Sequence, residues 1–432
     1  MKRIYPILIL LFTGLPFMKS QDTLSLNQVL ERIITTYPSM PQAQEAIKSA
    51  EARVAIAKAT YLPTLSGSAS YLWLDPISKL TLNNHSFNIQ PHHNLDFGVT
   101  LNQLLWDFGK NRPKVEAAQL QRKITELQKQ QVRQNLLLQG IRNYYMTAYA
   151  RHSIDIKIEE LSDYGKQLEQ TAIRKQSGSA TEFNYLNTHV SFSAVEAELT
   201  ALKAVKETQY VNLSVLADTV INDNTLLSLD FAMPREERTL DDLISYAFGN
   251  RPEMLITQTE YELARQQEKS ASRMYNPDLS MSASTGFKNG YEPDLNESRF
   301  NYSAGATLEI PIYTGGLRKQ QKNIAVSDAQ KALLTIEMMK REVTQTVSDN
   351  YYSLISSAAR IGQLSAQVNL AEKTYQQAQV NFKAGSITNL ELLTSITNKS
   401  NARLLLLQEK INFEITYYQL LQNIGMDLFP SR

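Results

Sequence analysis

The sequence contains no cysteine, and this absence removes several classes of site at once. A disulfide framework and zinc or iron–sulfur centres held by thiolates are excluded. A lipid-bearing cysteine behind an export signal is excluded as well, so we expect no lipoprotein anchor.

The chain also lacks an excess of charge of either sign, because 44 Lys and Arg residues face 43 Asp and Glu residues in a total of 432. Without residues 1–20 the balance becomes 41 basic against 43 acidic residues. Such a balance gives no reason to expect a nucleic-acid partner.

Long hydrophobic runs are missing beyond the N-terminus. No later segment stays apolar for the ~18–20 residues that a membrane-spanning helix needs. If the chain spans a membrane, we expect it to do so with strands.

Residue sets for catalysis or metal binding are absent too. There is no glycine-rich phosphate loop and no Ser/His/Asp set in a suitable context, so we expect neither an enzyme nor a cofactor. His85, His92 and His93 lie in the expected loop between the first two strands, and two interpretations are a metal site or an outward-facing polar loop. The polar loop is favoured, because no acidic or cysteine partners surround these histidines.

The N-terminus has the layout of a secretory signal peptide. Met1, Lys2 and Arg3 form a basic start, residues 4–17 are almost entirely apolar, and Ser20 can close a cleavage site. The alternative is a buried first helix. The segment is too short for a spanning helix, and we therefore expect export with residues 1–20 as the leader.

The sequence contains an internal duplication. The stretch from Tyr61 to Ser70 recurs from Tyr275 to Ser284, and Gly178 has its counterpart in Gly385. A repeat of this length is far too long for a solenoid unit and indicates two fused halves.

Each half contains the same predicted elements: a short and a medium helix, two strands, and a long helical hairpin with a glycine at its tip. We expect a first repeat over 21–218, with strands at about 64–74 and 94–105 and a hairpin over 110–216. A linker over 219–239 precedes a second repeat over 240–425, with strands at about 278–288 and 300–312 and a hairpin over 317–424. Residues 426–432 form a short tail.

The hairpin helices are predicted to pack as coiled coils. Apolar residues in the first arm recur at steps of three and four, which is the spacing of a coiled-coil seam. At ~1.5 Å per residue each hairpin is roughly 100 Å long, so its helices must pack against other long helices. The seam residues of the first arm are Ile124, Leu127, Leu138, Ile141, Tyr145 and Ala148.

The four strand segments alternate apolar residues with small or polar residues. This pattern, with aromatic residues near the strand ends, is typical of outer-membrane strands. A soluble antiparallel sheet with one wet face is the alternative, and alternation alone does not exclude it. The export signal and the fourfold recurrence favour the membrane, with the aromatic residues Tyr71, Trp73, Phe97, Phe287, Phe300 and Tyr302 facing lipid.

Four strands do not close a barrel, because the smallest membrane barrels have about eight. Several copies must therefore each contribute four strands. Two copies make a barrel filled by side chains, whereas three make one that is wide enough for a lumen. The long hairpins favour three copies.

In these features the chain resembles the TolC-type outer membrane factors, also called outer membrane efflux proteins. The resemblance covers nearly the whole mature chain and includes the tip sequence from Asn381 to Leu393. It implies a mainly α, internally duplicated protomer whose four strands join a trimeric 12-stranded β-barrel above a long α-helical periplasmic barrel. It also implies a homotrimer in outer membrane lipid that works with a periplasmic adaptor and an inner-membrane pump or ABC exporter.

The resemblance places the periplasmic entrance and the adaptor contact at the hairpin tips. The resemblance assigns this role to residues of both tips and to the arginine four positions before the first glycine. These residues are Arg174, Gly178, Ser179, Phe382, Gly385, Ser386 and Ile387. Characterised members close the entrance with a tyrosine and an arginine where this chain has Phe382 and Ile387, so the closing contacts must differ here.

The family also carries two acidic rings in the lumen after the second tip. This chain keeps an acid only at Glu391 and has Thr394 at the second position. Either Glu391 forms a single ring of three carboxylates, which would favour cations, or it is an ordinary solvated helix residue.

The leading hypothesis is a passive exit duct of a tripartite efflux or type I secretion system. A secreted coiled-coil scaffold or adhesin with soluble hairpins is the alternative. A third hypothesis, a hydrolase displayed on a stalk, is disfavoured because the sequence contains no residue set for catalysis.

Overall fold

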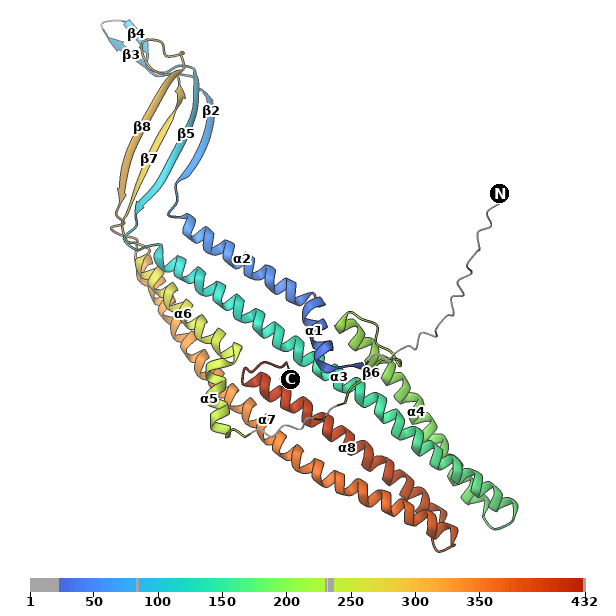
Figure 1. Cartoon of the computed structure of the whole chain (residues 1–432). Coiled ribbons are helices and arrows are strands. Elements are labelled where there is room, and N and C mark those ends of the chain that lie inside the picture. The colour runs from blue at the N-terminus through green and yellow to red at the C-terminus, as the bar shows by residue number, and fades with distance from the viewer. Residues whose placement is uncertain (1–22, 83–84, 230, 232–236, 430–432) are drawn as a thin grey trace, which may run out of the picture.

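The structure is a computed structural model, and it describes residues 23–82, 85–229, 231 and 237–429. The protomer is elongated, with a sheet at one end and two helical tips at the other (Figure 1). The expected signal peptide lies outside the described residues.

Two very long helices run through most of the molecule. Helix α3 (Arg112–Gln176) has 65 residues and α7 (Leu317–Lys383) has 67, so each is about 100 Å long. Each turns at a glycine into a shorter helix, α4 (Glu182–Ala217) after α3 and α8 (Asn389–Asn423) after α7. The six expected seam residues of α3 are all buried, from Ile124 to Ala148.

Four shorter helices complete the helical part. Helices α2 (Ser39–Ala59) and α6 (Pro252–Arg273) pack beside the halves of α3 and α7 nearer the sheet, which α4 and α8 do not reach. Helices α1 (Leu26–Thr36) and α5 (Leu240–Asn250) lie at mid-length, and α1 packs on α3 and α4 (Figure 1). The main hydrophobic core lies at this height, around Leu30, Ile141 and Leu213.

The sheet consists of β2 (Thr64–Trp73), β5 (His93–Trp106), β7 (Asp278–Lys288) and β8 (Arg299–Glu309). All neighbours are antiparallel in the order β2-β5-β7-β8, so β2 and β8 are the edge strands. Strand β8 ends at Glu309, three residues before the predicted end of the last strand, so Ile310 lies beyond it.

The structure contains two small strand pairs that were not predicted from the sequence. Strands β1 (Thr23–Leu24) and β6 (Leu226–Leu227) pair in parallel, so the predicted linker contributes a strand. Strands β3 (Lys79–Leu82) and β4 (His85–Asn88) form a hairpin in the predicted loop. Strands of two to four residues carry too little periodicity to be recognised.

The placement of the histidines needs a correction. His93 is the first residue of β5, and its Nδ1 lies 2.8 Å from the Tyr71 hydroxyl, while His85 begins β4. Only His92 lies in a loop, where its Nδ1 is 2.9 Å from the Leu74 carbonyl oxygen. Within the described ranges, no group of three or more His, Asp or Glu side chains is arranged to hold a metal ion.

The expected fold class of the protomer is confirmed. It is mainly helical, carries one four-stranded sheet, and repeats the same order of major elements in its two halves. None of the described helices combines the length and hydropathy needed to cross a bilayer.

One glycine makes the centre of the sheet sterically intolerant of a side chain. A Cβ atom at Gly286 in β7 would come within 2.0 Å of the Phe97 carbonyl oxygen and 2.7 Å of the Gly98 Cα atom in β5. These are backbone atoms of a paired strand, so they yield only if the strands separate. A glycine within a strand often marks such a close backbone approach.

We therefore expect Gly286→Ala to weaken the pairing of β5 with β7, which joins the two halves of the sheet. The yield of folded, detergent-extracted protein should fall severalfold and its thermal midpoint should drop. Gly305→Ala in β8 is the matched control, because a Cβ atom there has nothing within 4 Å. Equal behaviour of the two variants would contradict the argument.

Candidate functional site

The sheet has two chemically different faces, because cross-strand partners point to the same side. Leu65, Leu101, Ala283 and Ala304 form one continuous row across the four strands. The neighbouring row on the other face is Ser66, Thr100, Ser284 and Ser303, with the last two hydroxyls 2.8 Å apart. The alternation seen in the single strands therefore adds up to one apolar and one polar face.

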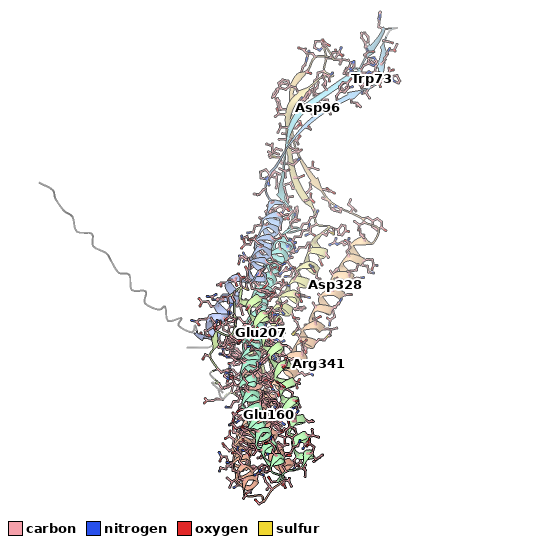
Figure 2. All side chains as sticks on the ribbon, turned by 90° about the vertical axis from the view of Figure 1, so that its right-hand side faces the viewer. Trp73, Asp96, Glu160, Glu207, Asp328 and Arg341 are labelled. Carbon is pink, nitrogen blue, oxygen red and sulfur yellow. The ribbon has the colours of Figure 1, made fainter. Side chains whose placement is uncertain are left out.

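The six predicted lipid-facing aromatic residues are all exposed in the protomer, between 51% and 80%. Phe97, Phe287 and Phe300 are direct cross-strand neighbours in one row. Trp73 and Asp96 lie toward the outer end of the sheet (Figure 2). The apolar face thus carries large side chains that the protomer itself leaves uncovered.

The two hairpin tips have the same backbone geometry. Gly178 and Gly385 adopt positive φ angles of 73° and 77°, which favour glycine. The serine after each glycine closes the turn: the Ser179 amide donates to the Arg174 carbonyl oxygen (2.8 Å) and the Ser386 amide donates to that of Asn381 (3.0 Å).

Two predicted entrance residues from different hairpins meet. The Arg174 guanidinium, near the end of α3, lies 4.4 Å from the centroid of the Phe382 ring, near the end of α7. The Phe382 side chain is buried beside Leu392 and Leu393, and Ile387 packs at the edge of this group. This cation–π contact links the two tips of one protomer.

Glu391 has a defined structural role. Its carboxylate accepts hydrogen bonds from the Thr388 amide (2.7 Å) and the Thr388 hydroxyl (2.8 Å), while the Glu391 amide donates to that hydroxyl. This capping box starts α8. The hydrogen bonds from the Thr388 backbone and side chain lower the pKa of Glu391, so the exposed carboxylate is ionised at neutral pH.

Near the tips, a row of buried polar side chains joins the two hairpins, and we call it the polar clasp. The Gln167 side-chain amide donates to the Asn389 side-chain oxygen (2.7 Å), and the Asn389 amide donates to the Thr188 hydroxyl (2.9 Å). All three residues are buried, so these hydrogen bonds join α3, α4 and α8 without access to water.

Farther from the tips, charged residues of both hairpins form a cluster, which we call the inter-hairpin charge cluster. Its centre is Lys399 of α8, whose side chain is 6% exposed. The Lys399 ammonium lies 2.7 Å from the Asp163 carboxylate and 3.0 Å from the Glu159 carboxylate, both on α3. The cluster comprises Lys157, Glu159, Glu160, Asp163, Glu198, Glu372, Lys399 and Arg403.

The remaining contacts complete the charge compensation. The Glu160 carboxylate, 2% exposed, accepts from the Lys157 ammonium (2.8 Å) and the Ser400 hydroxyl (2.7 Å). Arg403 joins Glu159 of α3 to Glu372 of α7. Glu160 lies low in the helical bundle, far from the sheet (Figure 2).

The sequence prediction missed both this cluster and the clasp. Their members are spread over four helices, and each one alone looks like a solvated helix residue. The one local signal, the i, i+3 pair of Lys157 and Glu160, is common on exposed helices.

Lys399→Met should destabilise the protein by about 3–5 kcal/mol, because it removes the buried counter-ion of the buried Asp163 carboxylate. Urea unfolding of the detergent-solubilised protein measures this change. Lys166→Met is the control: its ammonium lies 3.7 Å from Asp163, but its side chain is 69% exposed. We expect a loss below about 1 kcal/mol for the control, and equal losses would contradict a buried cluster.

The cluster also predicts acid sensitivity. Burial raises the pKa of Glu159, but the hydrogen bond and charge of Lys399 and the charge of Arg403 outweigh it and leave that pKa below its ordinary value. Because the folded pKa is depressed, this carboxylate stabilises the fold above its unfolded pKa of about 4.3, and the contribution is lost as pH falls further.

Arg403→Gln should therefore reduce the fall of the thermal midpoint between pH 5 and pH 3. Arg112→Gln, which breaks an exposed pair with Glu116, should leave the pH profile unchanged. Parallel profiles of wild type and Arg403→Gln would count against the assigned pKa shift.

Comparison with known proteins agrees with this architecture. The family model described as "Outer membrane efflux protein" matches residues 29–217 and 243–426. The outer membrane protein TolC of Escherichia coli is 21% identical over 98% of this chain and 87% of its own length. The alkaline protease secretion protein AprF of Pseudomonas aeruginosa is 24% identical over 82% of this chain and 75% of its own length.

Solved structures show the same fold. The outer membrane protein VceC of Vibrio cholerae superimposes with a TM-score of 0.78 and 20% identity, covering 93% of this chain and 96% of that one. The family model covers most of both halves, including both hairpins and all four strands of the main sheet. The chain belongs to the outer membrane efflux protein family.

Proposed function

We propose that this protein is the outer membrane exit duct of a tripartite efflux or type I secretion system, and that substrates pass through it without chemical change. One observation carries the proposal. A sheet with an uncovered apolar face and two open edges stands on helical hairpins about 100 Å long. A soluble protein would have to cover both the edges and the apolar face.

The open edges support a homotrimer. In lipid every backbone N–H and C=O group must be paired, so β8 of one copy has to meet β2 of the next. Three copies supply twelve strands around a lumen lined by the polar rows, and the aromatic residues face lipid. The hairpins then continue the duct into the periplasm, and residues 1–20 serve as the cleaved export signal.

The family supports the partners. The relatives include a protein named for alkaline protease secretion, and we propose an inner-membrane pump or ABC exporter and a periplasmic adaptor for this chain as well. The tips are the proposed entrance and adaptor contact, and Arg174, Phe382 and Ile387 lie next to the glycine turns. The proposed duct requires neither catalysis nor a cofactor, because the pump supplies the energy.

We further propose that the three Glu391 carboxylates form a ring at the entrance. The carboxylate is exposed, ionised and held at the start of α8 by its capping box. A ring of negative charge in a narrow passage favours cations.

Planar-bilayer recordings of the purified protein test the duct and the ring together. Glu391→Gln keeps an oxygen for the Thr388 hydrogen bonds but removes the charge, whereas Glu391→Ala removes both. We expect a small cation-selective conductance in wild type and an equal loss of selectivity in both variants. Only Glu391→Ala should also lower stability, because it breaks the capping box.

The outcomes separate the two proposals. Selectivity that is unchanged in both variants discards the ring and leaves the duct. Folded, membrane-inserted protein that never conducts, or protein recovered as soluble without detergent, contradicts the duct.

A further inference from the structure

Midway along the helical part, Arg142 of α3 and Asp349 of α7 carry charges that have no partner within the described ranges. The two residues are 207 positions apart, the same separation as that of the tip glycines Gly178 and Gly385, so they are counterparts in the two halves. Both residues are exposed, although the residues on either side of each are buried or half-buried. Two unpaired charges at matching positions of the duplication need an explanation.

The direction of Arg142 follows from the residues two positions before and after it. A Cβ atom at Gly140 would come within 2.6 Å of the Ile33 side chain, so this side of α3 faces α1. The Tyr144 hydroxyl donates to the Leu24 carbonyl oxygen in β1 (3.0 Å). Each helical residue turns by ~100°, so residues two positions apart point roughly 160° away from each other. Arg142 therefore points away from both α1 and β1.

Asp349 points away from α5 for the same reason. Val347 and Tyr351, two positions before and after it, pack in the main hydrophobic core together with Ala247 of α5. Helix α5 packs on α7 at mid-length, as α1 packs on α3 (Figure 1). In the proposed duct the short helices lie outside, because inside they would obstruct the passage. Arg142 and Asp349 then face the lumen.

The faces that carry these two residues can be followed along both helices, because residues at steps of seven share one face of a helix that packs as a coiled coil. The exposed residues at these steps are Gln128, Asn135 and Arg142 on α3 and Asp328, Thr335, Glu342 and Asp349 on α7. The α3 face thus carries two amides and a guanidinium, whereas the α7 face carries three carboxylates. Arg142 is the only basic residue among these seven, so it is the one position there that attracts anions.

Arg142 and Asp349 act as separate charges. Helices α6 and α8 each contact both α3 and α7 and lie between them. At the usual spacing of neighbouring helices, the axes of α3 and α7 are then roughly 16–20 Å apart. This distance exceeds the Debye length of ~8 Å at physiological ionic strength, so the two charges do not cancel each other.

Resting on the proposed duct function, we propose that Arg142 and Asp349 form a ring of alternating charges halfway along the duct, and that this ring binds charged groups of the cargo. Arg142 binds carboxylate or phosphate groups, which a guanidinium can hold through two parallel hydrogen bonds, and Asp349 binds ammonium groups. Arg142 lies 34 residues before the end of α3, so about 50 Å of helix separates the ring from the tip. The ring therefore acts independently of Glu391.

Ion selectivity in planar bilayers tests the ring, because its two charges should act in opposite directions. We expect Arg142→Gln to raise the cation-to-anion permeability ratio about twofold and Asp349→Asn to lower it by a similar factor. The double variant should return close to the wild-type ratio, and Arg142→Lys, which keeps the charge, should match wild type. All four variants should fold, since both residues are exposed and unpaired.

Inorganic triphosphate tests the binding of anionic groups. It should reduce the single-channel conductance of wild type, and the concentration needed for half of this effect should rise at least fivefold in Arg142→Gln. Arg32→Gln is the matched control for both measurements. Arg32 is an exposed arginine of α1 whose guanidinium donates to the Thr219 hydroxyl (3.0 Å), and in the proposed duct it lies outside. This control should behave as wild type.

Three results would overturn the inference. Arg142→Gln and Asp349→Asn could shift selectivity in the same direction or not at all, Arg32→Gln could shift it as much as Arg142→Gln, or triphosphate could act equally on wild type and Arg142→Gln. In each case the wild-type channel still conducts, so the duct stands. Folded, inserted wild-type protein that never conducts contradicts the duct itself, and the inference that rests on it falls with it.

Discussion

Backbone pairing in the sheet is the constraint on which the rest of the structure depends. Four antiparallel strands leave β2 and β8 with one unpaired edge each, and the apolar face between them is uncovered. The described part of one copy supplies a partner neither for the edges nor for the apolar face. In the proposed assembly, joining edges between copies in lipid provides both, and it brings the helical hairpins of several copies around a common axis.

The contact between α3 and α8 is held together by buried ion pairs and amide hydrogen bonds. Buried ion pairs add little net stability over apolar packing, but they strongly oppose separation of the partners.

The tips combine a shared backbone with individual side chains. Both turns need glycine for the positive φ angle and serine for closing the turn, and both α4 and α8 begin at a threonine cap. The side chains near these fixed points differ, and Arg174 of the first tip contacts the Phe382 ring of the second. The machinery of the turn is thus separate from the contacts that hold the tips together.

Much of the architecture could be predicted from the sequence because it depends on local periodicity. Alternation with period two indicated the four long strands, and steps of three and four indicated buried residues such as Ile124 and Ile141. The short strands β1, β3, β4 and β6 gave no such signal. The sequence prediction placed His93 in a loop, whereas His93 is the first residue of β5. A few residues do not establish a period.

The sequence by itself determined the duplication, the order of elements, the two faces of each strand and the glycine turns, because each of these is written in neighbouring residues. Only the tertiary structure decided that Lys399 lies against Asp163, that Gln167 reaches Asn389, and that Glu391 caps α8 while remaining exposed. The first two contacts join residues that are more than 200 positions apart in the chain, whereas the cap is local. A charged residue on a long helix looks the same in sequence whether water or a buried counter-ion surrounds it, and packing alone makes the difference.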